Sequence, residues 1–383
     1  MDYDLILGRY GEIALKSPRV RRKFESQLIH NIKSAFKTEA HIREGRIFIH
    51  PADFKEALDK LTKIFGIISF SPVIAMKTDK KVISTKLREY VEKLNSEGLF
   101  DEKKSFAIRC KRTGAHNFTS QELAAYAGSI VQDKIGAPVD LTKPDIEIFL
   151  EVRGGKTYLF HEIIPGPGGL PIGTSGKVVS LLSGGIDSAV ATYLIMKRGC
   201  KILALHFDTH PYTSKKTRIK IKKLADKLKE YSPGVEFELL TIEYGEYLDY
   251  CISKAPRNLT CILCKFGMYH IAEKIANEKK ALAIVDGNSI GQVASQTLHN
   301  ILATRYSVKI PILSPLIGFD KIEIENLAKR IGTYKISTSP NGACTAAPPH
   351  PATKISPQKL LKIKQSLDLD PKLEKIMETK TKY

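Results

Sequence analysis

The clearest chemical signal in this sequence is a short glycine-containing loop that follows an apolar run. Val178–Leu182 is apolar, and the next segment, Ser183–Ser188, reads Ser-Gly-Gly-Ile-Asp-Ser. Two adjacent glycines let the backbone approach an anion closely, while hydroxyl groups and a helix N-terminus supply donors and a positive dipole. Asp187 is suitably placed to hold Mg²⁺ against a triphosphate. We therefore predict a nucleotide-binding loop, although it is not a Walker A sequence. The alternative is a tight strand-to-helix turn with Ser188 as the N-cap.

A second group of reactive residues is formed by cysteines. Cys261 and Cys264 are a close pair, which we place just before a helix, and Cys344 lies far along the chain. Such a pair in a cytosolic protein indicates metal or redox chemistry rather than a disulfide framework. Three thiolates can hold a [4Fe-4S] cluster with one iron open. Persulfide transfer and a zinc site completed by His350 or His270 are the alternatives. The other cysteines are predicted to be ordinary thiols: Cys110, Cys200 and Cys251.

The charge balance points to a polyanionic partner. The chain has 60 Lys and Arg against 41 Asp and Glu, a formal charge of +19, which is typical of proteins that bind nucleic acid. A Lys-rich proteome is the alternative explanation. Arg19–Lys23 forms a dense basic cluster, and Lys111–Phe118 combines basic and aromatic residues. We expect the first to contact phosphates and the second to stack on exposed bases; a solvated helix face and a polar loop are the alternatives.

Composition excludes several classes of protein. The hydrophobic fraction is 43% and the charged fraction 26%, both ordinary for a folded chain. The apolar runs are far shorter than the roughly 20 residues that cross a bilayer, and the N-terminus does not resemble a signal peptide. We therefore expect a cytoplasmic protein without a membrane partner. A length of 383 residues predicts two or three domains.

The secondary-structure elements that must position these residues follow two different patterns along the chain. Residues 1–60 and 61–165 each mix short strands with amphipathic helices, such as Pro18–Phe36, as in small α+β domains. The segment 165–176 is rich in Gly and Pro and marks a boundary. From Lys177 strands and helices alternate, which predicts an α/β fold with a doubly wound parallel sheet. Its predicted strands are Val178–Leu182, Lys201–His206, Glu236–Ile242 and Leu282–Asp286, separated by helices over Ser188–Lys197, Lys215–Tyr231 and Cys264–Asn277.

Six separated segments, in order along the chain, resemble the tRNA 4-thiouridine synthetase family (ThiI). The resemblance implies a cytoplasmic ATP-dependent enzyme that adenylates uracil O4 of uridine 8 in tRNA and then replaces that oxygen with sulfur. It also implies a homodimer and contacts with the acceptor end of tRNA. The segments are Arg9–Lys16, Lys111–Glu122, Leu181–Ser188, Gly287–Thr297, Pro315–Lys321 and His350–Lys354.

The resemblance also implies a domain order. We expect an N-terminal ferredoxin-like domain over residues 1–60, a THUMP RNA-binding domain over 61–165, a linker over 166–176 and a PP-loop ATP pyrophosphatase domain over 177–383. The family's rhodanese domain is not expected, so that sulfur would arrive as sulfide or from a persulfide donor. The implied cofactors are ATP, Mg²⁺ and a [4Fe-4S] cluster.

The same resemblance assigns roles to individual residues. Asp187 and Lys321 are implied in activation, and Cys261, Cys264 and Cys344 in sulfur transfer as the ligands of the cluster. Without the resemblance, a lone Lys is better explained as a solvated helix residue, and His206 as a strand-end core residue. The residues implied to lie at the nucleotide are Leu181, Leu182, Ser183, Gly184, Gly185, Ser188, His206, Phe207, Lys265, Gly287 and Gln296.

The sequence departs from the family pattern at two places, and other functions are alternatives to the one that the resemblance implies. Ser17-Pro-Arg-Val-Arg stands where Gly-x-Asn-Arg is frequent, and Lys265 stands where Arg is common, which keeps the charge but loses bidentate geometry. The rivals within the superfamily are a tRNA thiolase acting at position 2 of the base and an amide-forming enzyme. A non-catalytic tRNA-binding protein is the rival from another class.

Overall fold

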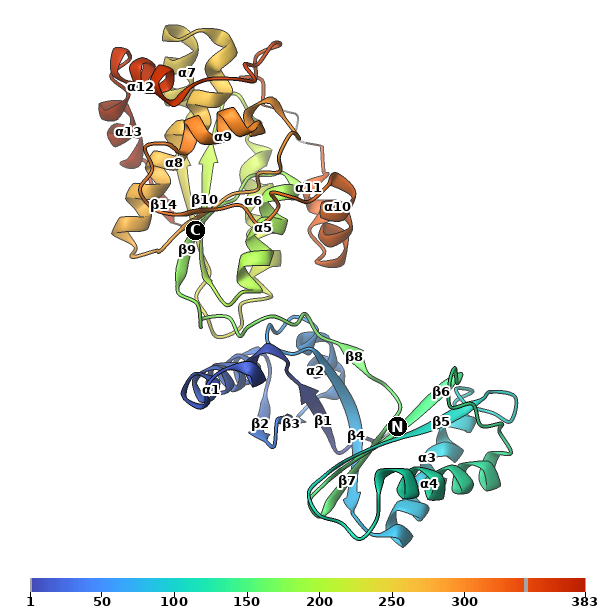
Figure 1. Ribbon diagram of the computed structural model, residues 1–383. Helices are drawn as coiled ribbons and strands as arrows, with labels where there is room; N and C mark the ends of the chain where they lie inside the picture. Colours follow the sequence, from blue (N-terminus) through green and yellow to red (C-terminus); the bar gives the residue numbers. More distant parts are fainter. Residues whose placement is uncertain (1, 341–343, 383) are drawn as a thin grey trace. The chain divides into compact units, whose positions relative to one another are not determined.

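The computed structural model describes residues 2–340 and 344–382 (Figure 1). The described chain forms two compact units. The helix α1 (Pro18–Ala35) is assigned to the second of these units, except for its last residue. One of its contacts there is the hydrogen bond that Asn31 Nδ2 donates to the carbonyl oxygen of Ile172 at 3.2 Å. Unit 1 comprises Met1–Ser17, Ala35–Thr62 and Ile67–Gly168, and unit 2 comprises Pro18–Ser34, Lys63–Gly66 and Gly169–Tyr383.

Unit 1 is built on one continuous sheet with the strand order β2-β3-β1-β4-β7-β6-β5, and β8 pairs with β4. Neighbouring strands are antiparallel except for β5 and β6, which are parallel. The two α+β regions expected from the sequence thus share a sheet. Its strands are β1 (Leu5–Arg9), β2 (Thr38–Arg43), β3 (Arg46–Pro51), β4 (Ser69–Lys77), β5 (Phe106–Thr113), β6 (Ile146–Arg153), β7 (Lys156–Phe160) and β8 (Ile164–Pro165).

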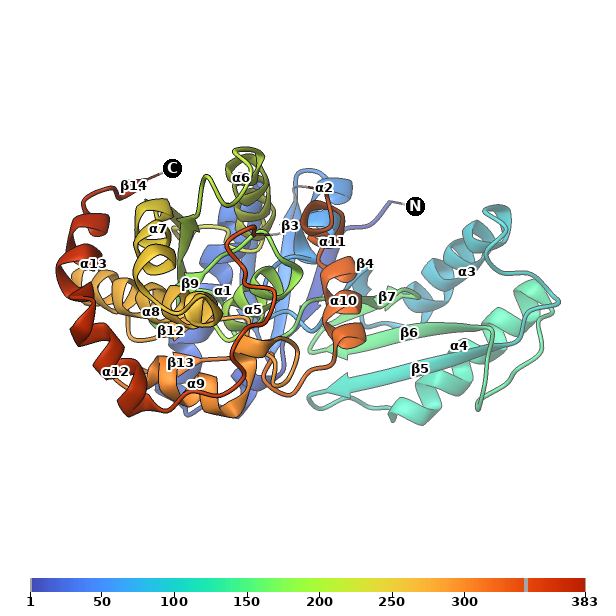
Figure 2. The same ribbon diagram turned by 90° about the horizontal axis from the view of Figure 1, so that it is seen from above.

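The helices of unit 1 are η1 (Glu12–Leu15), α2 (Phe54–Leu61), α3 (Lys80–Ser96) and α4 (Ser120–Ile135). Figure 2 shows α3 and α4 beside β5 and β6, where their apolar faces form one core with the sheet. The other face carries a second apolar cluster, in which the rings of Phe48 and Tyr158 lie 5.6 Å apart although two strands separate β3 from β7. There the buried Glu151 binds Arg46 Nε at 2.8 Å and Arg153 Nε at 2.6 Å.

Unit 2 contains the predicted parallel sheet, with the strand order β13-β12-β9-β10-β11-β14. The first five strands are parallel, and β14 adds an antiparallel edge that the sequence did not predict. The α/β prediction is therefore confirmed. The strands are β9 (Lys177–Leu181), β10 (Lys201–Asp208), β11 (Glu238–Glu243), β12 (Ile284–Val285), β13 (Ile312–Leu313) and β14 (Thr381–Lys382).

Helices cover both faces of this sheet (Figures 1 and 2). Successive side chains of a strand point to opposite faces, so that Val178 packs with α5, α6 and α10 while Val179 packs with α7 and α8. The helices are α5 (Ile186–Met196), α6 (Lys216–Lys229), α7 (Gly245–Lys254), α8 (Thr260–Glu278), α9 (Leu298–Arg305), α10 (Lys321–Arg330), α11 (Tyr334–Ser337), α12 (Pro357–Ser366) and α13 (Leu369–Met377), with the short turns η2 (Arg257–Leu259) and η3 (Ala294–Gln296).

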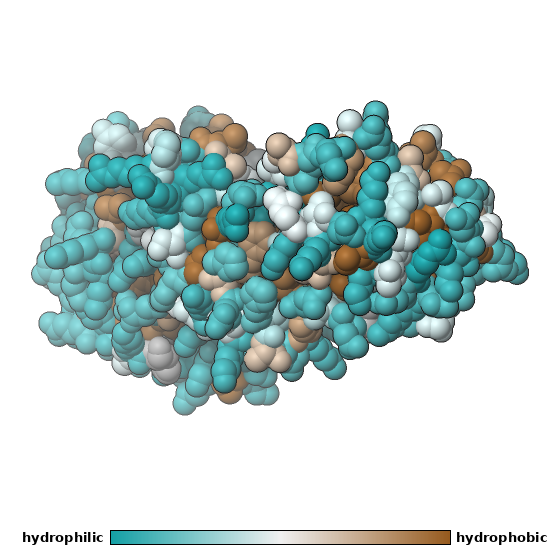
Figure 3. Space-filling view, turned by 90° about the horizontal axis from the view of Figure 1, so that it is seen from below, coloured by the Kyte–Doolittle hydropathy of each residue, from teal (hydrophilic) through white to brown (hydrophobic). Residues whose placement is uncertain are grey.

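Two element boundaries differ from the expected ones in this unit. Cys261 and Cys264 lie inside α8, which begins at Thr260, rather than before a helix. The expected strand Leu282–Asp286 contains the shorter β12, but its hydrogen bonds to the sheet extend further. The Leu282 amide donates to the carbonyl oxygen of Lys177 at 2.8 Å, and the Asp286 amide donates to that of Leu313 at 3.0 Å. Hydrophilic residues cover most of the face seen in Figure 3. Within the described residues, no helix combines the length and the apolar character that a membrane span requires.

Candidate functional site

The site lies at the carboxyl ends of β9 and β12, which are neighbours in the sheet. The chain proceeds from β9 to β10 on one side and returns to β12 on the other, and ligands of open α/β sheets bind at such a switch point. The loops after the two strands touch. A Cβ on Gly287 would lie 2.9 Å from the carbonyl carbon of Asp187 and from the amide nitrogen of Ser188. Only glycine therefore fits at position 287.

The predicted nucleotide loop is tied together by its own hydroxyl groups. Ser188 Oγ donates to the carbonyl oxygen of Ser183 at 3.0 Å, and the Ser183 amide donates to Ser188 Oγ at 3.1 Å. The N-cap of α5 is Gly185, without a side-chain cap, so Ser188 is not the N-cap that the structural alternative required. The loop is thus held in shape from within the first turn of α5, whose N-terminus can receive an anion.

Asp187 lies beside Lys321, as the two predicted activation residues would require. Lys321 Nζ lies 2.9 Å from Asp187 Oδ1, and Gln292 Nε2 donates to Asp187 Oδ2 at 3.0 Å. Both members of the ion pair are partly exposed. Lys321 opens α10, whose N-terminus is fixed by a capping box between Asp320 and Glu323. Gln292 was not predicted individually, although it lies within one of the segments that carried the family resemblance.

A cavity of about 320 Å³ joins the loop to the cysteines. This volume is within the usual range for small-molecule sites. Of the predicted residues, Leu181, Leu182, Gly287 and Gln296 do not line it. Asp187, Lys321, Gly185 and Ser188 belong to the loop and its rim instead. The predicted residues that do line it are Ser183, Gly184, His206, Phe207, Cys261, Cys264, Lys265 and Cys344.

The three predicted sulfur residues differ in their environment. Burial raises the pKa of the Cys261 and Cys264 thiols, and the neighbouring thiols raise it further, whereas Cys344 is exposed. Soft thiolates are suitable ligands for iron. Within residues 2–340 and 344–382, however, no three His, Cys, Asp or Glu side chains are gathered closely enough to hold a metal ion. The donor set fits a cluster by its chemistry, but the described side chains are not in a ligating arrangement. Residues 341–343, which precede Cys344, lie outside the described chain.

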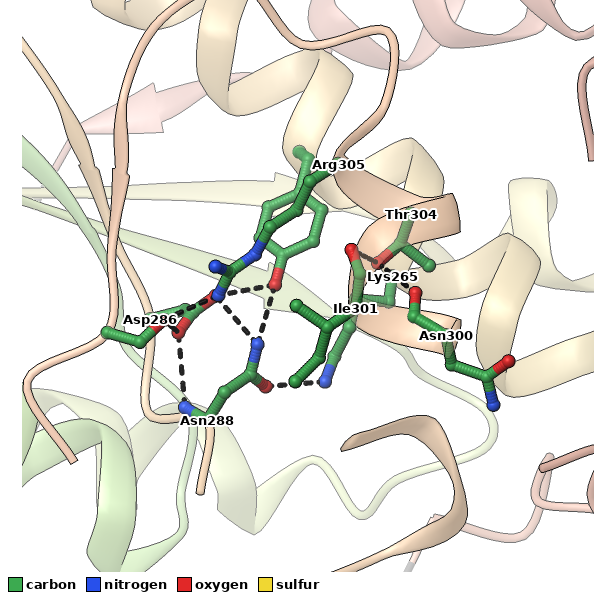
Figure 4. A network of polar contacts seen from close by, with 9 residues as sticks. Lys265, Asp286, Asn288, Asn300, Ile301, Thr304 and Arg305 are labelled. Atoms are coloured by element: carbon green, nitrogen blue, oxygen red, sulfur yellow. Dashed lines mark hydrogen bonds and ion pairs between the residues drawn. The ribbon is translucent and has the colours of Figure 1, made fainter. Parts of the chain in front are cut away.

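Lys265 is held in the cavity wall by a buried polar network (Figure 4). Lys265 Nζ donates to Asn288 Oδ1 at 2.7 Å, and Asn288 Nδ2 donates to Asp286 Oδ2 at 2.9 Å. Asp286 also accepts from the Tyr269 hydroxyl at 2.5 Å and from Arg305 Nη2 at 2.7 Å. Burial lowers the pKa of Lys265. Sequence reasoning missed this network, since its only local sign was the position of Asp286 at the end of an apolar run.

His206 lies at the end of β10 as a neutral imidazole. Burial is the main reason that its pKa is lowered. The carbonyl oxygen of Leu182 lies 3.1 Å from Nδ1 and can only accept, so Nδ1 carries the proton. Nε2 is buried and has no hydrogen-bond partner among the described residues, as is also true of Gln296 Oε1. Buried orphan acceptors of this kind indicate a ligand or water.

The basic segments predicted to contact RNA lie in different surroundings. Arg19, Arg22 and Lys23 are exposed on α1, and Lys111 is exposed at the end of β5. Phe118, in contrast, is 9% exposed and packs into the core of unit 1, so the expectation that it stacks on a base is wrong. Its apolar ring stabilises that core where the loop returns to α4.

The comparisons with known proteins agree along the whole chain. The sequence model described as "Thiamine biosynthesis protein (ThiI)" matches residues 173–369, the ThiI ferredoxin-like domain matches 5–71 and the THUMP domain matches 85–162. A "Probable tRNA sulfurtransferase" of Methanothermobacter thermautotrophicus is 60% identical, covering 98% of this chain and 97% of that protein. The protein of the same name from Methanobrevibacter smithii is 48% identical and covers 99% and 100%.

A solved structure agrees with the fold. It is the crystal structure of a 4-thiouridine synthetase–RNA complex with bound ATP, with a TM-score of 0.91 and 33% identity over 100% of this chain and 99% of that one. The match extends over both units, and the sequence models cover the loop, the cysteine pair and Lys321. On these grounds, the chain belongs to the ThiI family.

Proposed function

We propose that the protein is an ATP-dependent tRNA sulfurtransferase that converts uridine 8 of tRNA to 4-thiouridine. The observation that carries this proposal is the single cavity in which the phosphate loop, at Ser183 and Gly184, meets Cys261, Cys264 and Cys344. A nucleotide loop alone would suit many activating enzymes, and cysteines alone would suit many metal proteins. Their meeting in one cavity suits a reaction that activates a base and then delivers sulfur to it. The names of the relatives and of the RNA complex support the same reading.

The first step is adenylation. ATP binds with its phosphates at Ser183–Ser188, uracil O4 attacks the α-phosphorus, and the bond to the bridging oxygen breaks so that pyrophosphate leaves. Asp187 would hold Mg²⁺ together with phosphate oxygens. Lys321, already 2.9 Å from Asp187, is placed to neutralise phosphate charge as it develops. His206 Nε2 and Gln296 Oε1 are free to accept hydrogen bonds from the nucleotide. The other residues assigned to nucleotide binding are Leu181, Leu182, Phe207, Lys265 and Gly287.

The second step is sulfur transfer. Sulfur attacks C4 of the activated base, the C4–O4 bond breaks, and AMP leaves with the oxygen. Lys265, fixed by Asn288, presents a cation to this cavity. A [4Fe-4S] cluster bound to Cys261, Cys264 and Cys344 would supply an open iron that binds sulfide. A persulfide on one cysteine, resolved by a second, is the alternative source, with sulfur from a persulfide donor.

The basic surfaces are assigned to tRNA. Arg19, Arg22 and Lys23 on α1, and Lys111 on β5, are proposed to contact phosphates near the acceptor end. We also propose a homodimer, because Leu298 and Leu302 of α9 and Tyr306, which follows the helix, are exposed at a spacing of four residues, and exposed apolar patches mark contact surfaces. As a tRNA-modifying enzyme, the protein would act in the cytoplasm. Sedimentation of the wild type and of Leu302→Glu tests the dimer.

The deciding experiment is to incubate the anaerobically purified protein with ATP, Mg²⁺, sulfide and unmodified tRNA. Pyrophosphate release that depends on tRNA, together with 4-thiouridine at position 8, is the expected result. Thiolation at position 2 of a base would instead support the rival thiolase. Binding of tRNA without pyrophosphate release would support a non-catalytic protein. Iron, sulfide and zinc analysis of the same sample distinguishes a cluster from a persulfide or zinc site.

A further inference from the structure

A second cavity lies near the phosphate loop, in unit 2, and its lining is rich in lysine. It has a volume of about 420 Å³ and lies between α6 and α11. Three of its lysines occur on α6 at a spacing of four and three residues, which places them on one helical face. The lining as described contains no carboxylate that could balance them. The four lysines of this lysine cavity are Lys216, Lys220, Lys223 and Lys335.

Lys220 connects this cavity to the loop. A Cβ on Gly184 would lie 3.4 Å from Cδ of Lys220 and 3.9 Å from its Nζ. The same Nζ donates to the carbonyl oxygen of Ser339 at 3.1 Å. Lys220 is half-buried, and this burial lowers the pKa of its ammonium group. Gly184 also lines the cysteine cavity. The loop therefore has the thiols on one side and the lysine cavity on the other.

We propose that the lysine cavity binds the inorganic pyrophosphate that leaves ATP during activation. The inference rests on the proposed function, because it needs cleavage between the α- and β-phosphates. When that bond breaks, the bridging oxygen keeps the electron pair, and the departing group becomes a compact polyanion. Four ammonium groups around one cavity repel one another unless an anion is present. A cavity that reaches the loop through Lys220 suits a small polyanion released there, whereas an RNA backbone would need an extended basic surface.

The test measures the binding of two probes, inorganic pyrophosphate and AMP, to the full-length protein by isothermal titration calorimetry. Lys220→Ala should weaken pyrophosphate binding by about tenfold or more, the usual effect of losing one charged contact. AMP affinity should change less than about twofold, and Lys220→Arg should retain most of the pyrophosphate affinity. Lys335→Ala, on α11 and without a contact to the loop among the interactions described, should weaken pyrophosphate binding by about threefold or more. Lys229→Ala, in the last turn of α6, is the matched control and should change neither.

Each contrary outcome is decisive. A wild type that binds AMP but not pyrophosphate overturns the inference, as does unchanged pyrophosphate binding in Lys335→Ala. If Lys220→Ala weakens AMP and pyrophosphate equally, the loop itself has been disturbed, and selective loss in Lys335→Ala is then required. Weaker tRNA binding with unchanged pyrophosphate binding would assign the cavity to RNA. The protein could also bind pyrophosphate through these lysines and yet release no pyrophosphate from ATP in the presence of tRNA. That result would overturn the proposed function but not the pyrophosphate site.

Discussion

Two aspartates of this site, Asp187 in the first turn of α5 and Asp286 directly after β12, differ in burial and in hydrogen bonding. Asp187 is partly exposed and is paired with Lys321 and Gln292. Asp286 is 5% exposed and accepts hydrogen bonds from Tyr269, Asn288, Arg305 and Ser314. Exposed ion pairs contribute about 1 kcal/mol or less, while breaking a buried one costs about 3–5 kcal/mol. Asp187 can therefore exchange its partners for a ligand, and Asp286 cannot.

This difference separates two tasks around one cavity. We assign the exposed side, with Asp187 and Lys321, to the binding of phosphate and metal. The buried side, with Asp286 and Asn288, fixes Lys265 beside Cys264 in the wall of the cavity. If this division is correct, separate substitutions should disable activation and sulfur transfer one at a time. Substitutions on the buried side should also lower the free energy of unfolding.

The largest expected effect is on sulfur transfer. Cys261→Ala, Cys264→Ala and Cys344→Ala should each reduce 4-thiouridine formation to background, because sulfur delivery needs the set. Pyrophosphate release that depends on tRNA should persist at near wild-type rate, since Asp187 is not among the residues that line the cavity of these thiols. The two rates are measured on the same samples.

The matched control for the sulfur prediction is Cys110→Ala. Burial raises the pKa of Cys110 to about 11, so the thiol is protonated and unreactive near neutral pH, and it lies in unit 1. Normal thiolation is expected in this variant. Full thiolation by any of the three cavity variants would remove that cysteine from the proposed set.

Asp187→Ala tests the exposed side. We expect pyrophosphate release to fall by about 10²–10³-fold, the usual effect of losing one preorganised electrostatic contact to the transition state. The free energy of unfolding should change by about 1 kcal/mol or less, because the lost ion pair is partly exposed. tRNA affinity should remain within about twofold. Wild-type pyrophosphate release would contradict the role assigned to this carboxylate.

Asp286→Ala tests the buried side. Removing this carboxylate leaves Arg305 without its ion pair at 2.7 Å, and the Tyr269 hydroxyl without its acceptor. We expect the free energy of unfolding to fall by about 3–5 kcal/mol, measured by urea denaturation. Asp187→Ala, in the first turn of α5, is the control on the exposed side. Equal destabilisation by the two variants would show that the contrast between the sides is not real.

The sequence predicted the exposed side better than the buried side, and the reason is physical. A nucleotide loop needs glycines and hydroxyls in a fixed local order, so Ser183–Ser188 was visible without a structure. The order of strands and helices in unit 2 was also visible, because each strand is a short apolar run. Asp286, Asn288 and Arg305 meet only through the fold, and a single polar residue after a strand carries no local signature.

The errors have related causes. The helix α8 was expected to begin at Cys264, but burial of Ile262 and Leu263 in the core extends it to Thr260. Phe118 was expected on the surface because basic residues surround it, yet the loop that contains it returns to the core. Where tertiary packing decides burial, local composition is a poor guide.

The smallest expected effect is a pH dependence that belongs to His206. Its pKa is lowered in the folded protein, so below about pH 6.5 the unfolded chain binds the proton first and stability falls as pH falls. One such group contributes a slope of at most about 1.4 kcal/mol per pH unit.

In His206→Gln the side-chain amide can still donate to Leu182, but it does not titrate. The loss of unfolding free energy between pH 7 and pH 5, measured by urea denaturation, should therefore be smaller in the variant than in the wild type. His299→Gln, which replaces a histidine that is exposed on α9, is the control and should follow the wild type. Identical pH profiles for His206→Gln and the wild type would mean that the imidazole at the end of β10 is not held neutral by its burial.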